Sequence, residues 1–231
     1  MGEDVRPGRP DPGPQGPAGQ LAGLLAGPGR SPWGWPGLPQ SEPGEGPVLR
    51  RSSVVVLAGN IDGDVGFLLL RRSRRMRFHP GEFAFPGGGV EPGETPVQAA
   101  IRECREETGI VLTPDHILGA LPALTVQVSG NTVTPVLAWL GDQARDYPAR
   151  QWLDRETEST HWITRGHLAD PAHRLTVTDE QWWSGPGFSV DDGYVWGFTA
   201  VVLDWILTEL SWSRPWDSAR THRVQDPDLR R

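Results

Sequence analysis

Apolar residues first gather into strand-length runs after residue 50. Residues 53–58 (SVVVLA) and 66–70 (GFLLL) are apolar, and the turn sequence NIDGD at 60–64 separates them. Short apolar runs bounded by turn residues are typical of buried strands. The pattern predicts a β-hairpin here, a short extended piece at 82–85, and further strands at 117–128, 132–140 and 159–163.

Two stretches have helical periodicity instead. The first, at 96–108, follows Thr95, which is suited to a capping box with Gln98, and it ends before Gly109, which suits a left-handed C-terminal position. Apolar residues also recur at helical spacing between 193 and 210. Strands mixed with two separated helices predict an α/β protein in which helices pack on both faces of a mixed sheet.

Composition divides the chain into three parts. Residues 1–50 contain 12 Gly and 11 Pro. Such a segment has too few apolar side chains for burial to offset the conformational entropy lost on ordering. We therefore expect a disordered extension at 1–50, a domain at 51–212 and a flexible polar tail at 213–231. An alternative for the extension is a segment that docks a partner through Trp33 and Trp35.

Charge and cysteine content exclude several classes of protein. The 231 residues carry 22 Lys+Arg, all of them arginine, against 29 Asp+Glu, for a net charge of −7, which disfavours general nucleic-acid binding. No apolar run is long enough to cross a membrane, and no secretory signal is expected. The single cysteine, Cys104, cannot form an internal disulfide, so we expect a cytoplasmic protein.

The expected helix at 96–108 carries three carboxylates along one edge. At 100° per residue, Glu103, Glu106 and Glu107 fall in one stripe beside the apolar face. Like charges at this spacing repel each other, and a bound divalent cation would remove the repulsion. Hard oxygen ligands favour Mg²⁺ or Mn²⁺. For these acids alone, a solvated acidic helix face is the alternative interpretation.

A longer pattern surrounds these acids. Gly88 is followed after five residues by Glu94, and after seven more by RECREETGI at 102–110. This resembles the Nudix box, G-x5-E-x7-R-E-U-x-E-E-x-G-U with U apolar, at every fixed position. The resemblance implies a Nudix α/β/α sandwich with a mixed β-sheet that hydrolyses a nucleoside diphosphate linked to another group. It further implies roles for individual residues: metal ligation by Glu103, Glu106, Glu107 and the Gly87 carbonyl, orientation of a carboxylate by Arg102, and a structural role for Glu94.

Cleavage of a diphosphate needs a base that aims a water molecule at phosphorus. Within the resemblance, Glu103 is the preferred base. Glu156 and Glu158, on a later segment of the chain, are the alternatives.

Arginines gather just before the box. Five of them lie between residues 71 and 77, within the segment LLLRRSRRMRFHPGEFAFPGG at 68–88. The segment is similar to the signature of coenzyme A pyrophosphatases, L-L-T-x-R-S-x3-R-x3-G-x3-F-P-G-G, with Leu70 in place of Thr. Arginine forks suit phosphate, and coenzyme A has a 3′-phosphate besides its diphosphate; a solvated basic loop is the alternative. The resemblance suggests four substrate contacts: Arg72, Ser73, Arg77 and Phe85.

These patterns together predict an enzyme that uses Mg²⁺ or Mn²⁺ to cleave coenzyme A or its derivatives into 3′,5′-ADP and 4′-phosphopantetheine. A monomer or homodimer is expected, with a small-molecule substrate and neither nucleic-acid nor membrane partners. One alternative is the same chemistry on ADP-ribose, a dinucleotide or an oxidised nucleotide. Another is a Nudix-fold regulator that binds nucleotides without turnover.

Overall fold

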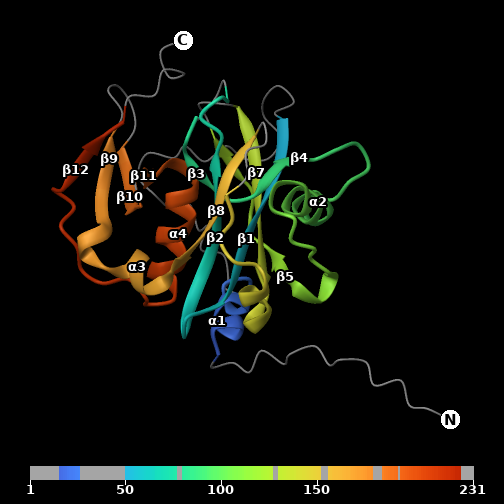
Figure 1. The fold of residues 1–231 in the computed structure, drawn as a ribbon, viewed down its shortest axis with the longest axis horizontal. Coiled ribbons are helices and arrows are strands. Elements are labelled where there is room, and N and C mark those ends of the chain that lie inside the picture. The colour runs from blue at the N-terminus through green and yellow to red at the C-terminus, as the bar shows by residue number, and fades with distance from the viewer. Residues whose placement is uncertain are drawn as a thin grey trace.

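A mixed sheet of eight strands forms the centre of the protein (Figure 1). A computed structural model describes residues 16–26, 50–76, 80–126, 130–151, 156–178, 184–191 and 193–224. The strands of the sheet are β1 (Arg50–Ile61), β2 (Asp64–Arg72), β3 (Phe83–Ala84), β4 (Gly87–Gly89), β5 (Ile117–Ala120), β6 (Leu124–Val126), β7 (Asn131–Trp139) and β8 (Thr157–Thr164).

The order of these strands makes the sheet mixed. The main path is β3-β2-β1-β7-β5, with β4 paired to β1, β6 to β7 and β8 to β2. β1 and β7 run parallel, whereas β1 and β2 form the antiparallel hairpin that the sequence predicts. The run expected at 117–128 is divided into β5 and β6, and Pro122 lies in the break. Proline has no backbone N–H to offer a ladder, which explains why pairing stops there.

A helix covers each face of this sheet (Figure 1). Helix α2 (Pro96–Thr108) buries Ala100 and Cys104 against β1 and β2, in the cluster that contains Leu57 and Leu68. Helix α4 (Gly197–Glu209) packs on the opposite face, where neighbouring strand residues such as Phe67 belong to the other core cluster. Adjacent residues of a strand point to opposite faces. The α/β/α sandwich expected from the sequence is therefore confirmed.

A second sheet lies on the far side of α4 (Figure 1), and the sequence did not predict it. Its strands run in the order β11-β10-β9-β12. Two expectations change as a result, because residues 193–195 form a strand rather than helix, and residues 221–223, inside the expected tail, pair in parallel with β9. The bounds are β9 (Arg174–Thr178), β10 (Ser184–Val190), β11 (Gly193–Val195) and β12 (Thr221–Arg223).

The remaining helices of the described residues are short. They are α1 (Pro17–Gly23), α3 (Arg165–Ala169), and the 3₁₀ turns η1 (Pro114–His116), η2 (Gly141–Asp146) and η3 (Pro171–His173). Within the described ranges, none of the helices is long and apolar enough to cross a membrane.

Helix α1 corrects part of the expectation for residues 1–50. Leu21 is 1% exposed and belongs to the core cluster on the α4 face. Pro17 at the start of the helix suits its first turn. The helix forms because burial of Leu21 in the core stabilises it. The Gly- and Pro-rich composition of residues 1–50 does not indicate this burial. Trp33 and Trp35 lie outside the described residues.

We expect Leu21→Ala to destabilise the protein by about 2–5 kcal/mol, the usual cost of emptying a buried leucine site. Gln20→Ala, on the same helix and only partly buried, is the matched control and should change the free energy of unfolding by less than about 0.5 kcal/mol. Urea unfolding of both variants measures the difference. Equal stabilities would show that α1 does not contribute to the core.

Candidate active site

Strand β4 brings the backbone against the carboxylate helix. Gly87 and Gly88 pair with Val54 and Ser53 of β1. A Cβ atom added to Gly87 would lie 2.7 Å from the Cα atom of Val54, and one added to Gly88 would lie 2.5 Å from the Cδ atom of Glu103. Real Cβ atoms do not approach other atoms this closely. Gly87 is therefore required for β4 to lie directly against β1, and Gly88 for Glu103 to lie directly against β4.

Glu107 is held at the junction of β4 and α2. The Gly87 N–H donates a hydrogen bond of 2.8 Å to its Oε2 atom. Burial raises the pKa of the Glu107 carboxyl to about 8, and the negative charges of Glu103 and Glu156 add to the rise, while the Gly87 N–H and the charge of Arg72 oppose it. Three acids and one arginine therefore act on each other here.

Arg102 connects the acids of the box. Its guanidinium donates to both carboxylate oxygens of Glu94, at 3.0 and 3.1 Å, and to Oε1 of Glu103 at 2.8 Å. It also donates to the Gly89 carbonyl at 2.9 Å and to Glu106 at 3.3 Å. These bonds, that to Glu94 first, raise the pKa of Arg102, and the same pairing lowers the pKa of Glu94. A bidentate arginine–carboxylate pair fixes orientation as well as charge.

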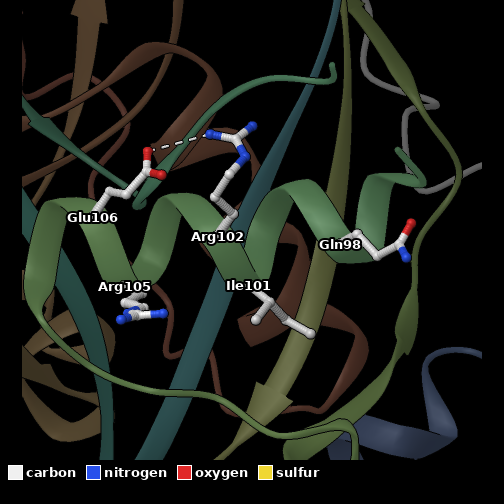
Figure 2. Close-up of a pocket in the computed structure, with 5 residues that line it drawn as sticks. All are labelled: Gln98, Ile101, Arg102, Arg105 and Glu106. Atoms are coloured by element: carbon white, nitrogen blue, oxygen red, sulfur yellow. Dashed lines mark hydrogen bonds and ion pairs between the residues drawn. The ribbon is translucent and has the colours of Figure 1, made fainter. Parts of the chain in front are cut away.

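The outer surface of α2 has a hollow of about 530 Å³. All five lining residues come from α2 itself, and Figure 2 shows Arg102 and Glu106 on one side of the helix and Ile101 and Arg105 on the other. Among the described residues that line this hollow, Glu106 is the only carboxylate, and Gln98 contributes an amide. The hollow therefore lies beside the cluster of Glu103 and Glu107 rather than within it.

The donor set of this cluster suits a divalent cation, although the acids are not drawn together around one point. Among the described residues, no group of three or more His, Cys, Asp or Glu side chains converges in the manner of a metal site. Glu103 and Glu106 instead both turn toward Arg102. Glu107, mostly buried and next to another acid, is costly to ionise without a cation. Three carboxylates on adjacent turns of α2 supply the hard oxygen donors that an Mg²⁺-type ion prefers.

The arginine loop, by which we mean residues 71–81, begins beside these acids. Arg72 donates its backbone N–H to Glu82 and accepts one from Gly81, at 2.9 and 3.1 Å, which closes the base of the loop. The Nε atom of Arg72 is buried and has no hydrogen-bond partner among the residues that the structure describes. Ser73 donates its N–H to the Glu156 carbonyl at 2.7 Å, so the loop carries Arg72 and Glu156 to the same side as Glu107.

The remaining residues expected at the site have different surroundings. Phe85 is 3% exposed in the core cluster of the α4 face, so its side chain supports the loop and is not available for the substrate contact that we expected. Ser73 is 6% exposed and its hydroxyl accepts the N–H of Arg75. Glu158 pairs with Arg74 at 3.8 Å. Arg77 lies outside the described residues.

Cys104 has no chemical role in this site. Burial raises the pKa of its thiol to about 12, against the opposing effect of a hydrogen bond with Thr108. A thiol that stays protonated is a poor nucleophile. Cys104 therefore packs, as its apolar position in the box indicates.

Some residues near the arginine loop gave no signal in the sequence. Tyr194 of β11 and His222 and Arg223 of β12 lie beside Arg71 and Arg74 in one cleft. These residues are far apart in the chain and belong to no motif. Only pairing of the second sheet brings them together, and the sequence did not predict that sheet.

The raised pKa of Glu107 leads to a pH prediction for the metal-free protein. The folded-state pKa, about 8, is above the ordinary value of 4.5, so protonation of Glu107 favours the folded state. This stabilisation is complete below about pH 4.5 and is lost as the pH rises toward 8, by at most about 5 kcal/mol. Chemical unfolding in EDTA across this range should show the loss, and Glu107→Gln should remove most of the slope. A wild-type slope that Glu107→Gln leaves unchanged would contradict the assignment.

Comparison with known proteins identifies the family. A family model described as the NUDIX domain matches residues 49–183. The chain therefore belongs to the Nudix family, as the box resemblance implied, and is a Nudix pyrophosphohydrolase. Enzymes of this family act on small nucleotide derivatives and generally use divalent metal ions.

Three curated relatives show which members of the Nudix family this chain is similar to. An uncharacterized Nudix hydrolase NudL of Pectobacterium atrosepticum is 30% identical over 183 residues, which are 74% of this chain and 90% of that protein. The peroxisomal coenzyme A diphosphatase ndx-8 of Caenorhabditis elegans is 34% identical over 58% of this chain and 57% of its own length. The mitochondrial coenzyme A diphosphatase NUDT8 of Homo sapiens is 31% identical over 62% of this chain and 61% of its own length. The chain thus covers less than two thirds of either diphosphatase.

Proposed function

We propose that this enzyme hydrolyses the diphosphate of coenzyme A or its derivatives and releases 3′,5′-ADP and 4′-phosphopantetheine. The observation that carries the proposal is the coenzyme A-type signature at 68–88, which lies beside the Nudix box in the structure, where the charge of its Arg72 acts on Glu107. The similarity to two coenzyme A diphosphatases supports the same substrate. A cytoplasmic location belongs to the proposal, because Cys104, the single cysteine, is a free thiol.

The residues of the Nudix box have different roles in the proposed reaction. Glu103, Glu106 and Glu107, with the carbonyl of Gly87, would hold Mg²⁺ or Mn²⁺, which supplies neutralisation of charge on the diphosphate oxygens. Arg102 keeps the carboxylate of Glu103 in place through the 2.8 Å bond to its Oε1 atom.

Glu103 is our candidate for the general base. The Oε1 atom of Glu103 already accepts a hydrogen bond from Arg102, so Oε2 takes the proton of the attacking water. Glu156 and Glu158 are the alternative bases. Of these two, Glu156 is the stronger alternative because its charge acts on Glu107, whereas Glu158 pairs with Arg74.

Arg72 lies beside the acids and therefore stabilises the negative charge of the diphosphate rather than the distant 3′-phosphate. We expect Arg72→Ala to lower kcat/KM for coenzyme A and dephospho-coenzyme A alike, by about tenfold or more, since a charged hydrogen bond contributes about 1.5–3 kcal/mol. Kinetics on both substrates measure this. A loss confined to coenzyme A would contradict the placement of Arg72.

A substrate panel tests the function itself. Coenzyme A, dephospho-coenzyme A, ADP-ribose and a dinucleotide are each incubated with Mg²⁺, and products are identified by mass spectrometry. We expect coenzyme A to give 3′,5′-ADP and 4′-phosphopantetheine, with a higher kcat/KM than any other substrate of the panel. Cleavage of ADP-ribose without cleavage of coenzyme A would reject the substrate, and turnover of none of them would favour the binding regulator.

A further inference from the structure

A second cleft, of about 400 Å³, lies between the arginine loop and the second sheet. Arg71 and Arg74 line it on the side of the loop, and Tyr194, Trp196, His222 and Arg223 line it on the side of β11 and β12. None of these residues belongs to the carboxylate cluster. The cleft therefore requires a separate explanation.

The charge of the cleft suits an anion. Three arginines, Arg71, Arg74 and Arg223, face one carboxylate, Glu82, across its lining. Arginine forks match the geometry of phosphate oxygens. Arg71 Nε donates to the Gly81 carbonyl at 3.4 Å, and Arg74, which is mostly exposed, pairs with Glu158 at 3.8 Å.

The same cleft offers aromatic surface. The ring of Tyr194 stacks on that of His222, with centroids 3.9 Å apart and an interplanar angle of 25°, and Trp196 lies in the same lining. Flat rings of this kind stack on nucleobases. Phosphate-binding arginines beside a stacking platform are the combination that a phosphorylated nucleoside needs.

The wall formed by β11 is fixed to the first sheet. His161 of β8 pairs with Asp191, at the turn before β11, over 3.0 Å, and the His161 ring meets Phe83 edge-on at 5.1 Å. Gly193 approaches Phe83 so closely that an added Cβ would lie 2.9 Å from its ring. The Tyr194 side of the cleft is thus positioned before any ligand binds.

The cleft and the carboxylates are next to each other in the chain. Arg71 and Arg72 are consecutive at the end of β2, where the register with β8 shifts. Arg71 lines the cleft, whereas the charge of Arg72 acts on Glu107. A ligand with its diphosphate at the carboxylates and a second phosphate in the cleft would therefore run around the end of β2.

We propose that this cleft binds the phosphorylated nucleoside end of the substrate, with the 3′-phosphate on Arg71, Arg74 and Arg223 and the base against Tyr194. The inference rests on the proposed coenzyme A hydrolysis, because that substrate joins a 3′-phosphate nucleoside to the diphosphate. It adds residues of the second sheet to the recognition of substrate.

Binding of 3′,5′-ADP in EDTA tests the cleft without turnover. Calorimetry on the full chain should show tighter binding of 3′,5′-ADP than of 5′-AMP. Arg223→Gln should weaken 3′,5′-ADP by about tenfold and leave 5′-AMP nearly unchanged, whereas Tyr194→Ala should weaken both and Tyr194→Phe neither. Arg145→Ala, an exposed arginine paired with Asp142 elsewhere on the surface, is the matched control. Unchanged binding in both Arg223→Gln and Tyr194→Ala would overturn the inference.

Kinetics separate this inference from the proposed function. Arg223→Gln should raise KM for coenzyme A about tenfold and leave KM for dephospho-coenzyme A and both kcat values within twofold. If wild type cleaves coenzyme A and this variant has unchanged KM, the cleft is rejected and the function stands. If wild type does not cleave coenzyme A, the proposed function is rejected, and the binding measurements still decide whether the cleft takes a phosphorylated nucleoside.

Discussion

Glu103→Gln should lower kcat by about 10²- to 10⁴-fold, the range expected when a general base is lost. The substitution keeps the size of the side chain and its hydrogen-bonding oxygen, so Arg102 retains a partner. It removes the negative charge that lies against Gly88 and acts on Glu107. Steady-state kinetics with coenzyme A and Mg²⁺, with thermal unfolding to verify the fold, measure the effect.

Matched variants make the result specific. Glu91→Gln changes an exposed acid outside the cluster and should retain full activity. Glu156→Gln tests the strongest alternative base. Activity of Glu103→Gln within twofold of wild type, together with a large loss in Glu156→Gln, would reassign the base to Glu156.

Gly88→Ala should reduce kcat by about 10²-fold, because the new Cβ overlaps the carboxylate of Glu103 and forces it to move. Displacement of a catalytic group by about 1 Å has an effect of this size. The nearby atoms belong to the end of a flexible side chain, so the fold should survive. Kinetics and thermal unfolding measured together distinguish a displaced acid from an unfolded protein.

The neighbouring glycines supply the comparison. Gly89→Ala meets nothing within 4 Å and should behave as wild type. Gly87→Ala meets backbone, with the Cα atom of Val54 at 2.7 Å, and should lose stability by about 1–3 kcal/mol through overpacking. If Gly88→Ala and Gly89→Ala have the same kcat, contact between Gly88 and Glu103 is not important for catalysis.

The parts of the fold that depend on local signals were predictable from the sequence. Helix α2 begins after Thr95, with its capping box to Gln98, and ends at Gly109 with a φ of 74°, as expected. Capping and left-handed glycines act over four or five residues, which a sequence displays directly. The β1–β2 hairpin is predictable for the same reason, because Asp62 and Gly63 form its turn.

The second sheet depends on contacts between distant segments, and this explains why the sequence did not indicate it. β10 contains Gly185, Pro186 and Gly187, residues that are typical of turns. They extend here because β9 pairs with them, while β11 pairs with the next residues, 188–190. β12 is a short polar segment whose partner, β9, lies more than forty residues earlier.

In the candidate site, too, the features set by local sequence were predictable and those set by distant contacts were not. The spacing of Glu103, Glu106 and Glu107 on one helix predicts that they share an edge, and the structure brings Glu94 to Arg102 beside them. The sequence alone did not show that Arg71 and Arg72 face different sites. The pairing of β2 with β8, with its register shift between these two residues, determines where each one lies. Burial of Phe85 is likewise a property of the assembled core.

Anomalous diffraction from a crystal soaked in Mn²⁺ tests most directly whether the acids of α2 hold the metal. We expect one or more manganese peaks bonded to oxygens of Glu103, Glu106 and Glu107, and no peak in Glu106→Gln and Glu107→Gln combined. Manganese bound only elsewhere, or absent at concentrations that support turnover, would contradict this expectation.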